Sequence, residues 1–70
     1  LSVVLNGEMN DEFVVTIMDM EGRLLDQQLH TLASAKDIID FNTSSLASQI
    51  AIISIERGGE KVTGRIIIQH

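Results

Sequence analysis

The sequence contains no cysteine, proline, tryptophan or tyrosine, and two phenylalanines are its only aromatic residues. Without cysteine, the chain can form neither a disulfide framework nor a thiolate metal site, so packing alone must stabilise the fold. Without proline, its turns must be made by glycine, asparagine, aspartate and serine. No apolar run is long enough to form a membrane-spanning helix, so we expect no membrane insertion.

Positive charge is also scarce. The sequence contains five Lys and Arg residues and ten Asp and Glu residues, which gives a formal net charge of −5. Nucleic-acid-binding domains neutralise phosphates with clustered basic side chains, so we expect no nucleic-acid partner. Seventy residues allow one domain, and a domain of this size is marginally stable alone. The sequence begins inside an expected strand, so we predict that residues 1–70 form a single domain of a longer protein.

Short segments rich in β-branched and aliphatic residues run along the whole chain, with turn-forming residues between them. They number about six, at a spacing of roughly 8–12 residues, which is typical of a sandwich or barrel. The sequence therefore predicts an all-β fold. The expected strands lie at 1–5, 12–20, 23–31, 37–41, 50–55 and 66–68.

The side-chain pattern of the second and third expected strands assigns their faces. In the second, Phe13, Val15 and Ile17 recur with a period of two and are expected to face the core. In the third, Leu25 and Leu29 are expected to share one face. The opposite face of that strand is mostly polar, so we expect it to be solvated.

Glycine marks two expected hairpin turns. In the first, Gly22 is expected to have a positive φ, which glycine adopts without steric cost. In the second, Gly58 and Gly59 join two β-branched runs. A tight corner or a single helical turn is expected where polar residues precede Leu46.

The hairpin at the end of the chain is unusually apolar, with runs at 50–53 and 66–68. On an open sheet edge such runs would promote aggregation. We therefore expect a core hairpin, buried on both faces and central in its sheets. The alternative is that one strand or face binds a partner by strand addition or apolar contact.

Candidate chemistry is sparse. His30 and His70 are the only histidines, and neither belongs to a cluster of ligands at metal-binding spacing. The acidic loop 8–12 lacks the residue order of a calcium loop, which leaves weak surface binding of Ca²⁺ as an alternative. Ser44 and Ser45 have no nucleophile setting and are explained by capping. We expect no enzyme, no cofactor and no metal site.

Three short motifs follow one another in a fixed order. The first is Asp-x-x-Gly-Arg at 19–23, the second is a corner ending in Ser-x-Leu at 41–46, and the third is a basic residue before an aliphatic run at 65–69. Together they resemble the C-terminal sorting domain of cargo of the type IX secretion system of Bacteroidetes. The resemblance covers the C-terminal two-thirds of the chain.

The chain departs from the family pattern at several positions. Asn42 stands for the usual Asp of the corner, and Arg65 stands for the Lys of the terminal motif. Gln49 and Ala51 occupy the places of the family's Gly and Tyr. The usual N-terminal proline-containing strand is absent. Loss of the Tyr predicts that other apolar side chains fill the core around Ala51.

The resemblance implies an immunoglobulin-like antiparallel β-sandwich of six to seven short strands that acts as a non-catalytic export signal. It implies recognition of the folded domain by outer-membrane secretion machinery, and removal by a sortase-like peptidase. The partner in the same chain would be an upstream cargo domain, secreted or held at the cell surface after transit through the periplasm. The implied recognition or fold residues are Asp19, Gly22, Arg23, Leu46, Gly58, Gly59, Arg65, Ile66, Ile67 and Ile68.

A second hypothesis is an accessory β-sandwich module for adhesion or carbohydrate binding in a secreted or surface bacterial protein. Sugar platforms are built from exposed aromatic side chains. Phe13 and Phe41 are the only aromatics and both are expected in the core. The sequence therefore favours the sorting signal over the sugar-binding module.

Overall fold

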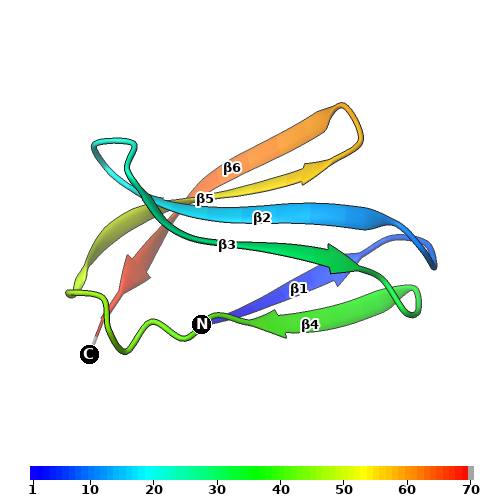
Figure 1. The fold of residues 1–70 in the computed structure, drawn as a ribbon, viewed down its shortest axis with the longest axis horizontal. Helices are drawn as coiled ribbons and strands as arrows, with labels where there is room; N and C mark the ends of the chain where they lie inside the picture. Colours follow the sequence, from blue (N-terminus) through cyan, green and yellow to red (C-terminus); the bar gives the residue numbers. More distant parts are fainter. Residues whose placement is uncertain (70) are drawn as a thin grey trace.

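The computed structural model describes residues 1–69, so His70 lies outside the described residues. Six strands form two antiparallel sheets (Figure 1), which confirms the predicted all-β sandwich. One sheet pairs β1 (Ser2–Asn6) with β4 (Lys36–Asp40). The other has the order β3-β2-β5-β6 and comprises β2 (Glu12–Asp19), β3 (Leu24–Thr31), β5 (Gln49–Arg57) and β6 (Glu60–Ile68).

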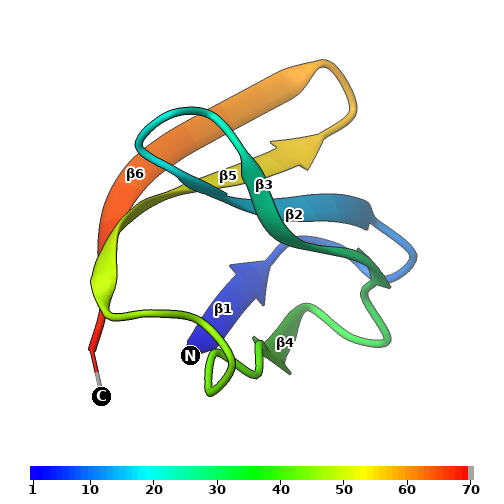
Figure 2. The ribbon, with the colours of Figure 1, turned by 60° about the vertical axis from the view of Figure 1, so that its left-hand side comes forward.

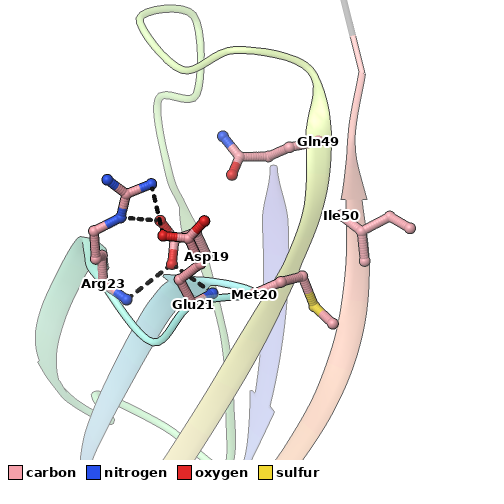
Figure 3. A pocket seen from close by; sticks show the side chains of 6 residues that line it. All are labelled: Asp19, Met20, Glu21, Arg23, Gln49 and Ile50. Carbon is pink, nitrogen blue, oxygen red and sulfur yellow. Dashed lines mark hydrogen bonds and ion pairs between the residues drawn. The ribbon is translucent and has the colours of Figure 1, made fainter.

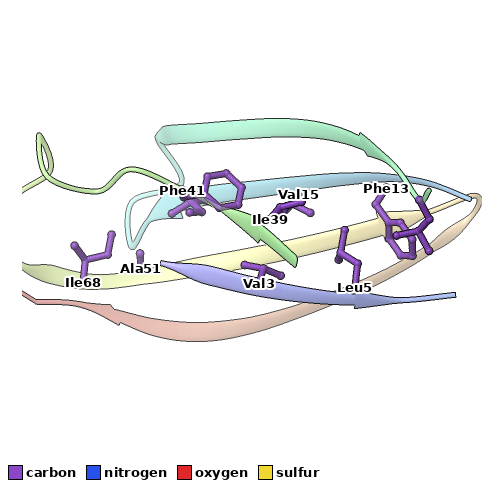
Figure 4. Close-up of a cluster of buried hydrophobic side chains, with 10 residues drawn as sticks. Val3, Leu5, Phe13, Val15, Ile39, Phe41, Ala51 and Ile68 are labelled. Atoms are coloured by element: carbon purple, nitrogen blue, oxygen red, sulfur yellow. The ribbon is translucent and has the colours of Figure 1, made fainter. Parts of the chain in front are cut away.

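The core lies between the two sheets, which form separate layers in Figure 2. In β2 the predicted alternation is confirmed, because Phe13, Val15 and Ile17 are at most 5% exposed. Ala51 is fully buried in the same cluster, to which Phe41 also belongs (Figure 4). The cluster consists of Val3, Leu5, Phe13, Val15, Ile17, Leu32, Ile39, Phe41, Ala51 and Ile68. Among residues 1–69, no helix is long and apolar enough to cross a membrane.

The predicted faces of β3 are wrong in part. Leu25 packs against the core as expected, but Leu29 is 76% exposed. The pairing of β2 with β3 shifts register between Ile17 and Met18, and this irregularity changes the phase of the alternation. Gln28 lies opposite Val15 as a result, on the inner side of the sheet.

Polar side chains of β3 bridge to β4 and close this side of the sandwich. The Gln28 side-chain amide donates to the Asp40 carbonyl over 2.8 Å, and His30 Nε2 lies 2.9 Å from Asp37 Oδ2. The hydrogen bond from His30, followed by one from the Ala33 backbone, holds the pKa of Asp37 below its usual value. The face that we expected to be solvated thus links the two sheets.

Both predicted glycine turns are confirmed. Gly22 has a φ of 86° and Gly58 has a φ of 59°. Arg57 pairs with Glu60, so Gly58 and Gly59 form a two-residue hairpin connection. The expected tight corner at Leu46 is also present, because the Leu46 N–H donates to the Thr43 carbonyl over 3.0 Å.

The prediction of a centrally placed hairpin that is buried on both faces is wrong. β5 lies inside the sheet, but β6 pairs only with β5 and is an edge strand. Ile50, Val62 and Ile67 are 52%, 69% and 70% exposed. The outer face has no second layer over it in either view (Figures 1 and 2), and Ile50 and Ile67 on this face are exposed to solvent.

Candidate functional site

The Asp-x-x-Gly-Arg motif forms the turn between β2 and β3. Asp19 ends β2, and its backbone N–H donates to the Arg23 carbonyl over 2.9 Å. The Gly22 backbone N–H donates a hydrogen bond to the Asp19 carbonyl over 3.0 Å. Its φ of 86° is in the left-handed region, which explains why this position of the turn suits glycine.

The Asp19 carboxylate organises this turn from within. Oδ1 accepts the backbone N–H groups of Glu21 and Arg23 over 2.9 and 2.8 Å. Oδ2 accepts Arg23 Nε over 2.7 Å (Figure 3). Asp19 is 7% exposed, whereas the Arg23 side chain is 73% exposed. The carboxylate is therefore structural, and the outer part of the guanidinium stays accessible.

These hydrogen bonds shift the titration of Asp19. The Arg23 backbone N–H is the largest influence that lowers the pKa of Asp19 below its ordinary value of 3.8, and the Arg23 side chain and the Glu21 N–H add to it. Partial burial acts in the opposite direction. The folded state thus favours the ionised carboxylate.

We expect this turn to make the chain sensitive to acid. Because the folded-state pKa is the lower one, the carboxylate contributes stability above its ordinary value of 3.8, and this is lost as pH falls through the folded-state pKa. Urea denaturation at pH values from 7 to about 2 should show a shallower acid loss for Asp19→Asn than for the native chain. Parallel curves for the two proteins would contradict this assignment. Asp37→Asn removes the other carboxylate whose pKa is lowered, so it should flatten the acid loss independently, and the effects of the two substitutions should add.

An open hollow of about 330 Å³ lies beside the turn (Figure 3). Its lining carries two carboxylates, one guanidinium, one amide and two apolar side chains. Among the residues that line it, none pairs a nucleophile with a base. The lining residues are Asp19, Met20, Glu21, Arg23, Gln49 and Ile50. Within residues 1–69, no group of three or more His, Cys, Asp or Glu could hold a metal ion.

Strand pairing brings the terminal motif to the same end of the sheet as the turn. Asp19 lies opposite Ala51, which lies opposite Ile66. Ile67 lies opposite Ile50, a residue of the hollow. The motifs at 19–23 and 65–69 therefore lie at the same end of the sheet on either side of β5, although more than forty residues separate them in the sequence.

The residues singled out from the sequence differ in their exposure. Ile68 is buried, and Ile66 and Leu46 are partly buried against the core. Arg65 and Ile67 are exposed. Gly58 and Gly59 lie at the other end of the hairpin, because Gln49 at the start of β5 pairs with Ile68. Exposure makes Arg23, Arg65 and Ile67 available for contact.

An apolar surface that the sequence analysis did not identify extends from this end of the sheet. We call it the outer apolar patch, and it comprises Met18, Met20, Leu24, Ile50, Ile52 and Ile67. Leu24 and Ile52 both lie opposite Met18, and Met20 is 52% exposed. These residues come from four segments, so their proximity depends on sheet order. The only signal in the sequence was the excess of aliphatic residues on both faces of the strands.

Comparison with known proteins yields one family. The family model described as the secretion system C-terminal sorting domain matches residues 1–69. No curated protein matches the chain. The match extends the resemblance found for the C-terminal two-thirds to β1 and the loop that follows it.

Proposed function

Because the chain belongs to the family of type IX secretion C-terminal sorting domains, we propose that it directs an attached cargo across the outer membrane. A type IX sorting tail implies a cargo that is secreted or held at the cell surface. The family is non-catalytic in general. The family match over residues 1–69 is the observation that carries this proposal.

We propose that the secretion machinery contacts the end of the sheet that carries the motifs at 19–23 and 65–69. Their position at the same end, with only β5 between them, supports this, since one binding surface can span both motifs. Arg23, Arg65 and Ile67 offer the exposed charged and apolar groups, next to the outer apolar patch. Large exposed apolar surfaces are characteristic of protein interaction sites.

The proposal includes two further partners: a cargo domain that precedes the sorting domain in the same chain, and a sortase-like peptidase that removes the sorting domain. Leu1 is 41% exposed, so its position at the surface is compatible with a preceding segment. The Leu1 amino group donates to the Phe41 carbonyl over 3.1 Å, which anchors the start of β1 beside the end of β4. A cargo joined at Leu1 would therefore be tethered to an ordered part of the domain.

The proposal is tested by fusing the 70-residue chain to a reporter protein in a host with a type IX secretion system. We expect the reporter in the medium or at the cell surface. Deletion of Arg65 to His70 should leave it in the periplasm. Retention of the reporter fused to the native chain would contradict the proposed function, and export after the deletion would contradict the role of the terminal motif.

A point variant separates recognition from folding, because the deletion also removes the buried Ile68. Ile67→Ser changes a side chain that is 70% exposed, and Leu29→Ser is a matched control that is 76% exposed on the same sheet. We expect Ile67→Ser to lower export about tenfold, the effect of losing roughly 1.4 kcal/mol of binding. Leu29→Ser should export normally. Equal export of the two variants would exclude Ile67 from the recognition surface.

A further inference from the structure

The free edge of β6 is long and regular. β6 contains nine residues, and its pairing with β5 from Arg57↔Glu60 to Gln49↔Ile68 has no register shift. Natural edge strands are usually short, bulged, covered or interrupted by proline. The opposite edge strand, β3, is linked to β4 by His30 and Gln28. β6 lacks such links among the described residues, so its outer backbone groups are open to another strand.

The unpaired positive charge of the protein is concentrated on this edge. Of the five basic residues, Arg23 and Arg57 form ion pairs with acidic residues of the chain. Within residues 1–69, the other three, Lys36, Lys61 and Arg65, form none, and two of these three belong to β6. Lys61 and Arg65 lie on the outer face of β6 on either side of Thr63, where Arg65 lies opposite Ile52 and Lys61 lies opposite Glu56 without forming an ion pair with it. An acidic partner strand complements this pattern.

The inner face of β6 is incompletely covered. Val62 lies opposite Ile55, which in turn lies opposite the buried Val15. Val62 is nevertheless 69% exposed. Gly64 lies opposite Ile53, and a Cβ added there would meet only Ile53 Cγ2 at 4.0 Å. The missing side chain leaves space over Ile53. A large side chain on a neighbouring strand can cover a glycine of this kind.

We propose that β6 binds an extended segment of a partner protein by antiparallel strand addition. The segment carries acidic side chains opposite Lys61 and Arg65, and a large apolar side chain opposite Gly64. Backbone hydrogen bonds supply affinity in this mode, and the alternating side chains supply specificity. This inference deepens the proposed function. It rests on that function in one respect, the identification of the partner as a component of the secretion machinery.

The chemistry favours an acidic partner over a second copy of the chain. Two copies would each bring a net charge of −5. Antiparallel self-pairing centred on Thr63 would also place Lys61 of one copy opposite Arg65 of the other, and like charges directly opposite are destabilising. An acidic, alternately apolar segment instead places unlike charges opposite Lys61 and Arg65.

A synthetic peptide tests the inference directly. The heptapeptide Val-Val-Glu-Phe-Thr-Val-Glu would run antiparallel to β6 from Ile67 to Lys61, with Phe opposite Gly64. Titration into the ¹⁵N-labelled 70-residue chain should shift amide NMR signals of β6 and β5. A peptide with Lys in place of both Glu residues should bind about tenfold more weakly. Absence of binding, or shifts confined to other strands, would overturn the proposal.

Charge reversal provides the matched variant. Lys61→Glu with Arg65→Glu changes two exposed side chains. Because Glu56 lies opposite Lys61, the variant also places two glutamates opposite each other, so far-UV circular dichroism is used to verify that the fold persists. This variant should prefer the lysine peptide over the glutamate peptide. An unchanged preference for the glutamate peptide would show that these cations do not face the bound segment, and would overturn the proposal.

Backbone pairing is tested separately, by N-methylating the peptide at alternate amides. Methylation at positions 2, 4 and 6 and methylation at positions 3, 5 and 7 should differ, because only one of these sets faces β6. Equal affinity of the two methylated peptides would contradict strand addition. Analytical ultracentrifugation of the chain alone tests for a second copy at this edge. If the chain sediments as a dimer, and if Lys61→Glu with Arg65→Glu alters that dimer, the occupant is a second copy, which would contradict the proposal.

The reporter fusion distinguishes failure of this inference from failure of the proposed function. Export of the native fusion together with no peptide binding would reject strand addition and leave the sorting role intact. Peptide binding without export of the native fusion would reject the sorting role and leave the β6 site intact. If both proposals hold, Lys61→Glu with Arg65→Glu should lower export about tenfold, in parallel with its weaker binding of the glutamate peptide.

Discussion

Replacing Phe41 with alanine is expected to lower the free energy of unfolding by about 3–5 kcal/mol, the usual cost of truncating a buried aromatic side chain. Phe41 is 2% exposed and is among the largest fully buried side chains. Its backbone N–H donates to the Leu1 carbonyl over 2.8 Å, so it also sits where β1 and β4 meet. A domain of this size rarely has more than about 3–5 kcal/mol of stability to lose, so the variant should be largely unfolded at 25 °C.

Urea denaturation followed by circular dichroism measures this loss, and Leu29→Ala is the control. Leu29 is 76% exposed, so its truncation should change the free energy of unfolding by no more than about 0.5 kcal/mol. A loss below about 1 kcal/mol for Phe41→Ala would mean that the core collapses around the gap. In the reporter assay, export of an unfolded Phe41→Ala fusion would contradict recognition of the folded domain.

The second large effect is expected at Gly7, where the loop between β1 and β2 passes close to side chains. A Cβ on Gly7 would lie 2.6 Å from Asp11 Oδ2 and 3.2 Å from Arg57 Nη1. That carboxylate oxygen already accepts the Glu8 N–H over 2.8 Å and Arg57 Nη1 over 3.2 Å. Gly7→Ala should therefore displace a hydrogen-bonded group, and we expect a loss of about 1–3 kcal/mol, as for other overpacked sites.

The displaced contacts extend beyond the loop. The Arg57 guanidinium lies 5.8 Å from the centre of the Phe13 ring, and the Gly7 N–H donates to the Ala35 carbonyl over 2.9 Å. Gly59→Ala is the matched control, because nothing lies within 4 Å of a Cβ at Gly59. Thermal denaturation should show a clear drop in Tm for Gly7→Ala and little change for Gly59→Ala. Equal Tm values would mean that the Asp11 carboxylate moves aside without cost.

In the candidate site, strand pairing brings two local sequence motifs to the same end of the sheet. The Asp-x-x-Gly-Arg turn could be predicted because its determinants lie within five consecutive residues: an acceptor at Asp19, a positive φ at Gly22 and a donor at Arg23. The terminal aliphatic motif could be recognised in the same way. Their position at the same end of the sheet depends on the pairs Asp19↔Ala51 and Ala51↔Ile66, which no short-range pattern specifies.

The faces of β3 illustrate the limit of periodicity. A period of two correctly assigned Phe13, Val15 and Ile17 to the core, because β2 is unbroken over these residues. The same rule failed at Leu29, because the register shift between Ile17 and Met18 separates Leu25 from the later alternation. An irregularity of this kind depends on the partner strand, so the sequence of β3 alone does not reveal it.

The sequence by itself determined the strand content, the turns at Gly22 and Gly58, and the motifs of the sorting-domain family. These features depend on backbone preferences and side-chain alternation over a few neighbouring residues. Only the tertiary structure decided that β5 is internal and β6 is an edge, which converts an apparently buried hairpin into an accessible strand with exposed Lys61 and Arg65. Sheet order and register arise from hydrogen bonding and packing between residues far apart in the chain, and these interactions are satisfied only when the whole sandwich has formed.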